Sequence, residues 1–290
     1  MFGAILTHRG IDIPLGTPSS EVCGESTWES FSSQVRSGFG LEFDIQPTKD
    51  GGFAISHDAD LSRITRGHTT QKLSEISTKD IARIQASGGR LCDLDELLDL
   101  LANEATAISA LHLKHQCQTP LILDLLSSRL QPFMSHLEDK LMVFDARPEA
   151  AARLKERIPD LSMAASVSHP YDVARFGAVT GNTLLTPYEV MKHRDLYNWA
   201  WLDEWDRRGP QGTKKMFISK DIIQTFHDNG FKVAIVSPEL HLTSPCLLGG
   251  EEHEDGASTL RLMKRFEEWA PINIDVLCTD YATYVHSIMG

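Results

Sequence analysis

Hydrophobic and polar positions follow two alternating patterns along the chain. Short apolar, β-prone runs are typical of buried strands, whereas most of the longer segments between them repeat apolar residues near the 3.6-residue period of an amphipathic helix. The strand-like runs are predicted at residues 4–7, 40–45, 107–113, 141–144, 161–167, 199–202, 232–236 and 275–279. The helix-like segments are predicted at residues 26–37, 94–102, 120–130, 148–157, 188–195, 219–228 and 257–269.

Eight strands alternating with helices favour one architecture over another. In a chain of 290 residues, such units indicate a closed parallel (β/α)8 TIM barrel, whose active site gathers at the C-terminal ends of the strands. An open doubly wound sheet would instead place a glycine-rich phosphate turn after the first strand, and residues 8–16, HRGIDIPLG, contain no GxGxxG. Because no repeat or linker divides the chain, we expect a single barrel domain over residues 1–290.

Three helix starts and one helix end carry local signals. Thr119 and Ser219 have the side-chain oxygen of an N-cap residue. Thr119 and Arg147 are each followed by proline, which is tolerated at the first helical position. Gly230 suits the left-handed position just past a helix end. These residues predict where three of the helices begin and where one ends.

Polar residues lie at the ends of several predicted strands, as an active site at the C-terminal ends of a barrel requires. They are His8 and Arg9 after the first strand, Glu42 and Asp44 late in the second, His112 and Lys114 at the end of the third, and Asp280 at the end of the last. The position of these residues therefore agrees with the predicted barrel.

Residues 41–58, LEFDIQPTKDGGFAISHD, combine the most informative of these groups. Alternate side chains of a strand point to one side, so Glu42 and Asp44 are expected to project together and to share one hard cation through oxygen ligands. They would otherwise be edge-strand charges facing water, but their apolar neighbours indicate a buried strand, in which carboxylates need a cation or basic partners. A turn at residues 50–52 then brings His57 back beside them.

Composition and charge narrow the classes of protein and partner. A hydrophobic fraction of 41% and a charged fraction of 23% are ordinary for a soluble globular protein, and no apolar run is long enough to span a bilayer. The formal net charge of −12 makes nucleic acid an unfavourable partner, because binding its phosphates relies on clusters of lysine and arginine. A small anionic substrate needs only local basic groups. The five scattered cysteines fit reduced thiols, and a cytoplasmic location is expected.

A series of polar and apolar motifs is spread along the chain. They are THRG at 7–10, ESTWESF at 25–31, LEFDIQPTKDG at 41–51, SHD at 56–58, LSRITRG at 61–67, LDELLDLL at 94–101, HLK at 112–114, HDNGFKVAIVS at 227–237 and CTDYATYV at 278–285. In order and spacing they resemble the glycerophosphodiester phosphodiesterase family. The resemblance is dense over roughly the first quarter of the chain and looser beyond it.

This resemblance implies a TIM barrel that hydrolyses phosphodiesters with one divalent metal ion, Mg or Ca in the family. On the matching positions, His8 and His57 would be the general acid and base. Arg9 would bind phosphate, and Glu42 and Asp44 would bind the metal. The residue types suit these roles, because histidine exchanges protons near neutral pH and arginine presents a planar fork of donors to phosphate.

The third strand departs from the family pattern. The family usually places an acidic metal ligand two residues before a lysine, whereas this chain reads His112-Leu113-Lys114. His112 could remain a ligand, which would shift the preferred metal towards Mn or Zn. It could instead have left the metal site, leaving Glu42 and Asp44 with water. Lys114 would be a second cation for the phosphate.

The run NWAWLDEW at 198–205 is a second departure. Its tryptophans, Trp201 in particular, could offer flat apolar faces to a sugar or glycerol group, with Asp203 bonding hydroxyls. Core packing explains at least one of the tryptophans equally well. If Trp201 and Asp203 face the active site, a sugar phosphodiester becomes a reasonable substrate, as in the family's agrocinopine-degrading relatives.

The sequence therefore predicts a phosphoric diester hydrolase that releases an alcohol and a phosphomonoester from a small glycerophosphodiester-like substrate. Two alternatives stay open. One is an enzyme for sugar phosphodiesters of the agrocinopine type. The other is a catalytically weak barrel that binds phosphodiesters, which only the change at His112 supports.

Other polar residues are expected to have lesser roles. Glu25 would brace Arg9, and Arg63 is expected in a structural ion pair. Nine further histidines, including His241 and His253, have no spacing that favours a metal cluster, and most of them are expected to be solvated.

Overall fold

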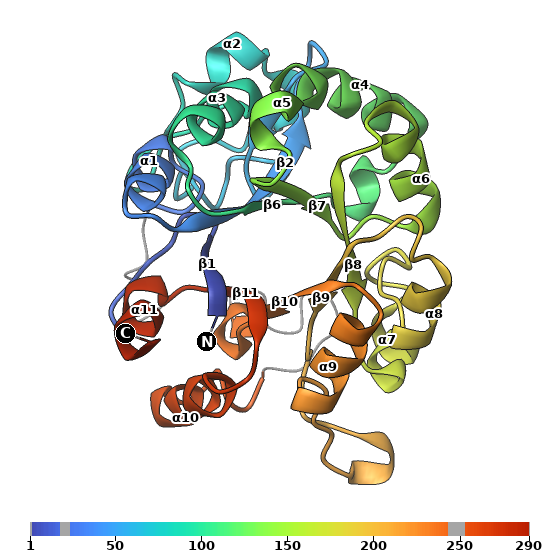
Figure 1. Cartoon of the computed structure of the whole chain (residues 1–290). Helices are drawn as coiled ribbons and strands as arrows, with labels where there is room; N and C mark the ends of the chain where they lie inside the picture. Colours follow the sequence, from blue (N-terminus) through green and yellow to red (C-terminus); the bar gives the residue numbers. More distant parts are fainter. Residues whose placement is uncertain (1, 18–23, 243–252, 290) are drawn as a thin grey trace.

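Within the residues that the structure describes, eight parallel strands close into a barrel surrounded by helices (Figure 1). The computed structural model describes residues 2–17, 24–242 and 253–289. The barrel closes because β1 pairs with β2 as well as with β11. In order around the ring, the strands are β1 (Phe2–His8), β2 (Gly40–Pro47), β6 (Ser109–His112), β7 (Leu141–Phe144), β8 (Ser162–Val167), β9 (Trp199–Leu202), β10 (Lys232–Val236) and β11 (Ile274–Thr279). The (β/α)8 prediction and all eight predicted strands are confirmed.

The larger helices pack around the outside of the barrel (Figure 1). They are α1 (Trp28–Arg36), α3 (Leu94–Glu104), α4 (Pro120–Leu130), α6 (Pro148–Arg157), α7 (Pro170–Phe176), α8 (Pro187–Lys192), α9 (Lys220–Asp228), α10 (Thr259–Trp269) and α11 (Ala282–Met289). All seven predicted helix segments are confirmed, whereas α7 and α11 fall outside them.

Smaller elements complete the connections between strands and helices. Strand β3 (Phe53–Ile55) pairs antiparallel with β2 and returns the chain towards the barrel end. The others are α2 (Thr78–Ile81), the β4–β5 hairpin (Gln85–Ala86 and Gly89–Arg90), α5 (Met134–Leu137), and 3-10 turns at Leu73–Glu75, His115–Cys117, Gln131–Phe133, Pro210–Gly212 and Pro238–Leu242.

Helix boundaries follow the local signals in the sequence. The hydroxyls of Thr119 and Ser219 each accept a hydrogen bond, at 3.4 Å, from the backbone N–H three residues later. Arg147 makes no side-chain cap, so Pro148 alone marks the start of α6. After α9, Gly230 has a φ of 82°, the left-handed conformation predicted for it.

The interior of the barrel is a packed apolar core. Alanines on β6, β8 and β10 alternate with the large side chains of β7 and β9, so small and large residues fit together around the ring. Its members are Leu6, Ala110, Met142, Phe144, Ala164, Trp199, Trp201, Ala234, Val276 and Cys278. A second and larger apolar layer lies between the strands and the helices, and includes Phe31, Leu97, Leu126, Phe226 and Phe266.

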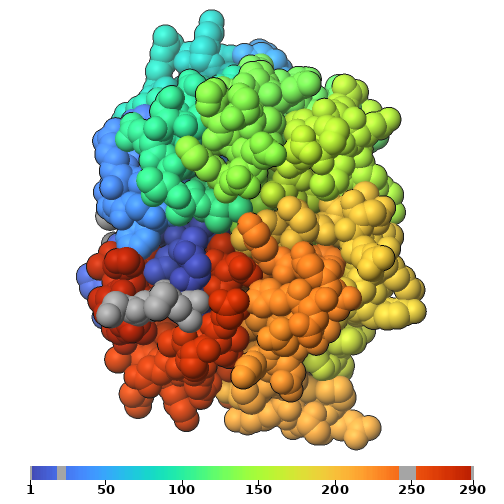
Figure 2. Space-filling view, in the orientation of Figure 1, coloured from blue at the N-terminus to red at the C-terminus, as the bar shows by residue number. Residues whose placement is uncertain are grey.

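Strand register brings the predicted polar residues together. His8 on β1 is the Cα partner of Glu42 on β2, and Asp44 on β2 is the partner of His112 on β6. The first and last strands also pair, so the blue and red ends of the chain lie side by side in Figure 2. This pairing places Asp280, which follows β11, beside the end of β1.

Two further expectations concern cysteines and membranes. The cysteines at 92, 117 and 278 are buried free thiols, as expected, and those at 23 and 246 lie outside the described residues. Among the helices that the structure describes, none is long and apolar enough to cross a bilayer.

Candidate active site

A cavity of about 700 Å³ lies at the C-terminal ends of the strands. Its size falls in the range of about 300–1,000 Å³ that is usual for small-molecule sites. Asp44 is 1% exposed and lies behind the cavity wall. The other residues predicted for the site all line the cavity: His8, Arg9, Glu42, His57, His112, Lys114, Trp201 and Asp203.

His8, at the end of β1, is held by a carboxylate that follows β11. Its Nδ1 lies 3.0 Å from Oδ1 of Asp280. The backbone N–H of Asp280 donates at 3.1 Å to buried Glu239, which also accepts hydrogen bonds from the hydroxyls of Ser237 and Thr279. Burial, together with the charge of Asp280, raises the pKa of Glu239 to about 7. Because Nδ1 of His8 is engaged, Nε2 is the nitrogen left to exchange a proton with a ligand.

His57, which follows β3, is held in the same way. Its Nδ1 lies 2.7 Å from Oδ1 of Asp58, and the other oxygen of Asp58 accepts a hydrogen bond from Nε of Arg63 at 2.6 Å. The backbone carbonyl of His57 accepts hydrogen bonds from Gln46, at 2.9 Å, and from the ammonium group of Lys114. Burial lowers the pKa of His57 below its ordinary value, against the opposing effect of the Asp58 hydrogen bond. The neutral imidazole, which accepts protons, is therefore favoured.

Arg9 lies between two acidic side chains. Its Nη1 donates to Oε1 of Glu25 at 3.0 Å, and its Nε lies 3.4 Å from Oδ2 of Asp44. Arg63 holds the same Glu25 at 2.8 Å, so the bracing by Glu25 and the ion pair of Arg63 are both confirmed. Arg9 has a φ of 56°, in the left-handed region, and Gly10 follows with 79°. Backbone conformations of this kind gather at functional sites, where the surroundings fix them.

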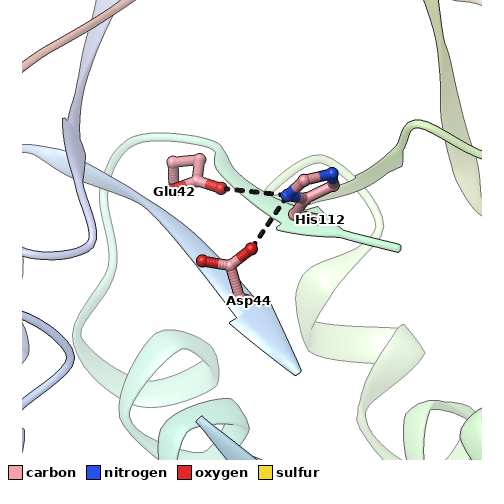
Figure 3. A group of neighbouring side chains, drawn as sticks. All are labelled: Glu42, Asp44 and His112. Carbon is pink, nitrogen blue, oxygen red and sulfur yellow. Dashed lines mark hydrogen bonds and ion pairs between the residues drawn. The ribbon is translucent and has the colours of Figure 1, made fainter. Parts of the chain in front are cut away.

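Glu42, Asp44 and His112 converge from β2 and β6 (Figure 3). One ligand atom of each lies within 4.8 Å of the others. Nδ1 of His112 is 2.8 Å from Oδ1 of Asp44 and 4.0 Å from Oε1 of Glu42. The remaining oxygens, Oε2 of Glu42 and Oδ2 of Asp44, are buried with no hydrogen-bond partner among the described residues. Oδ2 of Asp44 still has an ion-pair partner in Arg9, at 3.4 Å, whereas the unpartnered Oε2 of Glu42 is costly to bury. This set of two carboxylates and one imidazole therefore fits a divalent cation.

The pKa values of the two carboxylates, Glu42 and Asp44, shift in opposite directions. Burial and the neighbouring charge of Asp44 raise the pKa of Glu42. Burial alone would also raise the pKa of Asp44, but Lys114 and His112 hold it well below its usual value. Nζ of Lys114 lies 3.3 Å from Oδ1 of Asp44. Asp44 therefore has cationic partners already, whereas a bound cation would favour the ionised form of Glu42.

The second ring nitrogen of His112 contacts Asp145, which follows β7. Nε2 lies 3.3 Å from Oδ2 of Asp145, and the imidazole stacks on Phe144 with the ring centroids 4.6 Å apart. A carboxylate on the second nitrogen of a metal-binding histidine commonly fixes which nitrogen carries the proton. In this structure Nδ1 donates to Asp44. Burial would lower the pKa of His112, but the carboxylates of Asp145 and Asp44 raise it to about 9. A cation shared with Glu42 and Asp44 would have to displace the proton on Nδ1, while Asp145 keeps the one on Nε2.

Aromatic and polar side chains line another wall of the cavity. Trp201 on β9 stacks on Phe144 with the ring centroids 4.1 Å apart. Trp205 lines the same wall. Between the two tryptophans in the sequence, Asp203 places its Oδ1 2.8 Å from Nε2 of His241. Trp201 and Asp203 thus lie where a substrate-binding role requires them to be.

Some residues of the cavity were not predicted, namely Asp145 and His241. Asp145 directly follows β7 and His241 follows β10, so the rule that active sites gather at the C-terminal ends of strands could have found both. Most of the nine further histidines were expected to be solvated. His253, which is 1% exposed, and His241, whose side chain is 14% exposed, are not. Trp199 and Trp201, each 3% exposed, both belong to the apolar cluster inside the barrel, as the core-packing alternative expects for at least one tryptophan.

Comparison of sequences identifies a family. The sequence profile of the Glycerophosphoryl diester phosphodiesterase family matches residues 8–235. No curated protein sequence matches the chain.

Solved structures share the fold. A glycerophosphoryl diester phosphodiesterase from Parabacteroides distasonis ATCC 8503 is 17% identical, with a TM-score of 0.63 over 99% of this chain and 85% of that one. A glycerophosphodiester phosphodiesterase from Thermotoga maritima is 15% identical, with a TM-score of 0.60 over 99% of this chain and 99% of that one. An Oleispira antarctica phosphodiesterase, in complex with the product sn-glycerol-3-phosphate, is 14% identical, with a TM-score of 0.61 over 99% of this chain and 96% of that one. At these identities the similarity establishes the fold.

Proposed function

Because the chain belongs to the glycerophosphoryl diester phosphodiesterase family, whose members are phosphoric diester hydrolases, we propose that it cleaves a small glycerophosphodiester-like substrate to an alcohol and a phosphomonoester. One observation carries this proposal. His8 and His57 line a single cavity, and each has its Nδ1 bonded to a carboxylate. Two imidazoles fixed in this way suit general acid–base catalysis.

In the proposed reaction, the two histidines act on opposite sides of the phosphorus. The lowered pKa of His57 suits the general base, which takes a proton from the attacking oxygen. His8 is then the general acid, which gives a proton to the oxygen of the leaving alcohol. Asp58 and Asp280 keep the two rings oriented and stabilise the positive charge that each ring carries in turn.

Positive groups in the cavity would bind the phosphate. Arg9 offers a fork of donors, and Lys114 a point charge. A divalent ion bound by Glu42, Asp44 and His112 would draw charge from the non-bridging phosphate oxygens as negative charge builds up. The buried Oε2 of Glu42, which has no hydrogen-bond partner among the described residues, supports this ion. Mg or Ca is the family's expectation, whereas an imidazole donor favours Mn or Zn.

The organic part of the substrate is assigned to the wall that carries Trp201 and Asp203, since both residues line the cavity. A barrel that only binds phosphodiesters is the rival function. The two histidine–carboxylate pairs favour the enzyme, because a binding protein has no need for two oriented proton-transfer groups.

Metal-dependent turnover separates these functions. Hydrolysis of glycerophosphodiesters and of bis(p-nitrophenyl) phosphate is measured before chelation, after chelation, and after adding back Mn²⁺. We expect turnover to disappear with the chelator and to return with the ion. Turnover that survives complete removal of metal would contradict the proposed metal dependence, and binding without any turnover would favour the rival function.

A further inference from the structure

We propose that one wall of the cavity is a subsite for a neutral, hydroxyl-bearing ring, a sugar or a cyclic polyol, in the alcohol part of the substrate. Asp203 and His241 bond the hydroxyls of this ring, and Trp201 and Trp205 border it. The subsite rests on the proposed phosphodiester hydrolysis, and it specifies the class of alcohol that is released.

The order of the strands places this subsite across the cavity from the catalytic groups. In the ring of eight strands, β9 stands opposite β2, and β10 stands opposite β6. Asp203 directly follows β9, and His241 lies in the turn Pro238–Leu242 after β10. Glu42 and His112 belong to β2 and β6. A phosphodiester held at β1, β2 and β6 can therefore extend its alcohol part to Asp203 and His241.

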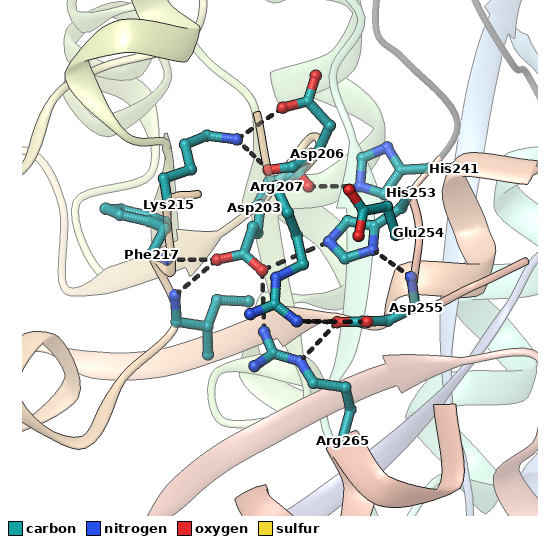
Figure 4. Close-up of polar contacts among 12 residues, drawn as sticks. Asp203, Asp206, Arg207, Lys215, Phe217, His241, His253, Glu254, Asp255 and Arg265 are labelled. Carbon is teal, nitrogen blue, oxygen red and sulfur yellow. Dashed lines mark hydrogen bonds and ion pairs between the residues drawn. The ribbon is translucent and has the colours of Figure 1, made fainter. Parts of the chain in front are cut away.

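Buried ion pairs fix the backbone that carries Asp203 (Figure 4). Along residues 203–206 the side chains alternate: Asp203 and Trp205 line the cavity, whereas Glu204 and Asp206 enter a buried ionic network. Anchoring alternate residues in this way keeps the other two facing the cavity before a ligand arrives. The network partners are Arg265 and His253 for Glu204, at 2.9 and 3.4 Å, and Arg175 and Lys215 for Asp206, at 2.8 and 2.9 Å.

Asp203 and His241 together offer an acceptor and a donor. The contact between them, at 2.8 Å, uses Oδ1 of Asp203 and Nε2 of His241. This leaves Oδ2 and Nδ1 for adjacent hydroxyls of a ring. Burial would lower the pKa of His241, but Asp203 raises it above its ordinary value, so the two residues form a pair without net charge.

Trp205 stands beside the Asp203–His241 pair and stacks on Phe176, with the ring centroids 4.9 Å apart. Its ring lines the cavity, with its centroid 5.8 Å from that of His241. Its Nε1 is buried and has no hydrogen-bond partner among the described residues, although a buried indole N–H usually has one.

Charge and polarity disfavour other classes of alcohol. A quaternary ammonium group binds best to an uncompensated carboxylate or to open aromatic faces. Here His241 compensates Asp203, and Phe144 covers one face of Trp201. An alkyl chain would remove water from the charged pair without replacing its hydrogen bonds, which costs free energy. A hydroxylated ring replaces those bonds.

Two diesters with the same glycerol 3-phosphate half test this subsite. Glycerophosphoinositol carries a neutral hydroxylated ring, and glycerophosphocholine carries a quaternary ammonium group. We expect the wild-type protein to have a higher kcat/KM for glycerophosphoinositol. In His241→Gln and Asp203→Asn, the ratio of the two kcat/KM values should fall roughly tenfold, as expected for the loss of one net hydrogen bond.

A matched control comes from the other end of the barrel. Nε2 of His227 lies 2.8 Å from Oδ2 of Asp275, the same separation as between His241 and Asp203, but neither residue lines the cavity. His227→Gln should leave the ratio unchanged. The subsite is overturned if the wild-type protein prefers glycerophosphocholine, or if His241→Gln and His227→Gln give the same ratio.

If the proposed hydrolysis is wrong, neither diester will be turned over. In that case, the binding of the two diesters is compared by calorimetry. Weaker binding of glycerophosphoinositol to His241→Gln, with binding of glycerophosphocholine unaffected, would still support the subsite. Equal effects on the two diesters would overturn it.

Discussion

Oδ1 of Asp280 lies 3.0 Å from Nδ1 of His8, although the two residues are 272 positions apart in the sequence. Closure of the barrel creates this contact, because β1 and β11 are neighbours. Asp280→Asn should lower kcat by roughly 10²-fold or more, because an amide neither orients the ring for the same proton transfer nor stabilises its positive charge. KM and the circular dichroism spectrum should change little. An unchanged kcat would show that His8 works without this carboxylate.

Asp145→Asn should weaken metal binding. The carboxylate lies 3.3 Å from Nε2 of His112 and would keep the lone pair of Nδ1 available to the ion. Loss of such an outer contact raises a metal Kd roughly 10- to 100-fold. Calorimetric titration with Mn²⁺ measures this directly. Asp275→Asn is the control, because Asp275 also contacts a histidine, His227, but away from the cavity. Equal Kd values for the two variants would show that the contact of Asp145 with His112 does not support metal binding.

Glu239→Gln should alter the dependence of stability on pH. The folded-state pKa of Glu239, about 7, lies above its ordinary value of 4.5. The stability contributed by the neutral carboxyl is therefore complete below about pH 4.5 and is lost as the pH rises through 7. Glutamine stays neutral at every pH in this range. The unfolding free energy of the variant minus that of the wild-type protein should therefore rise by up to roughly 3 kcal/mol between about pH 4 and 8. Urea unfolding across this range measures the shift, and a constant difference would contradict it.

Glu204→Gln should destabilise the fold strongly. Glu204 is 3% exposed and pairs with buried Arg265 at 2.9 Å. Removing one member of a buried ion pair costs roughly 3–5 kcal/mol, because the other charge stays buried. Glu104→Gln is the control, since Glu104 pairs with Arg36 at the same 2.9 Å but the two side chains are 40% and 63% exposed. That loss should be much smaller, because water screens an exposed ion pair. Similar losses in the two variants would show that the network around Glu204 does not stabilise the protein.

The elements that could be predicted are those with local patterns long enough to read. The strand Trp199–Leu202 and the helix Pro120–Leu130 begin and end where their apolar patterns do. Helices α7, Pro170–Phe176, and α11, Ala282–Met289, were not predicted. Their length alone does not explain this, because the predicted helix α8, Pro187–Lys192, is shorter, with 6 residues.

Some contacts of the candidate site could be predicted from the sequence and others could not. Glu42 and Asp44 could be paired from the sequence, because the two-residue period of a strand fixes their common side. The contact of Asp203 with His241 could not, because it joins two loops that follow different strands and no local pattern links them. His253 looked solvated within an acidic, glycine-rich stretch, yet it is buried against Glu204. Local polarity does not reveal a partner that the tertiary fold supplies.

Two-histidine catalysis is tested most directly by the turnover of metal-loaded His8→Ala and His57→Ala on the best glycerophosphodiester substrate. Each substitution should lower kcat by roughly 10²- to 10⁴-fold, while the circular dichroism spectrum and the Kd for the metal ion stay close to those of the wild-type protein. Undiminished turnover in both variants would contradict the proposed mechanism.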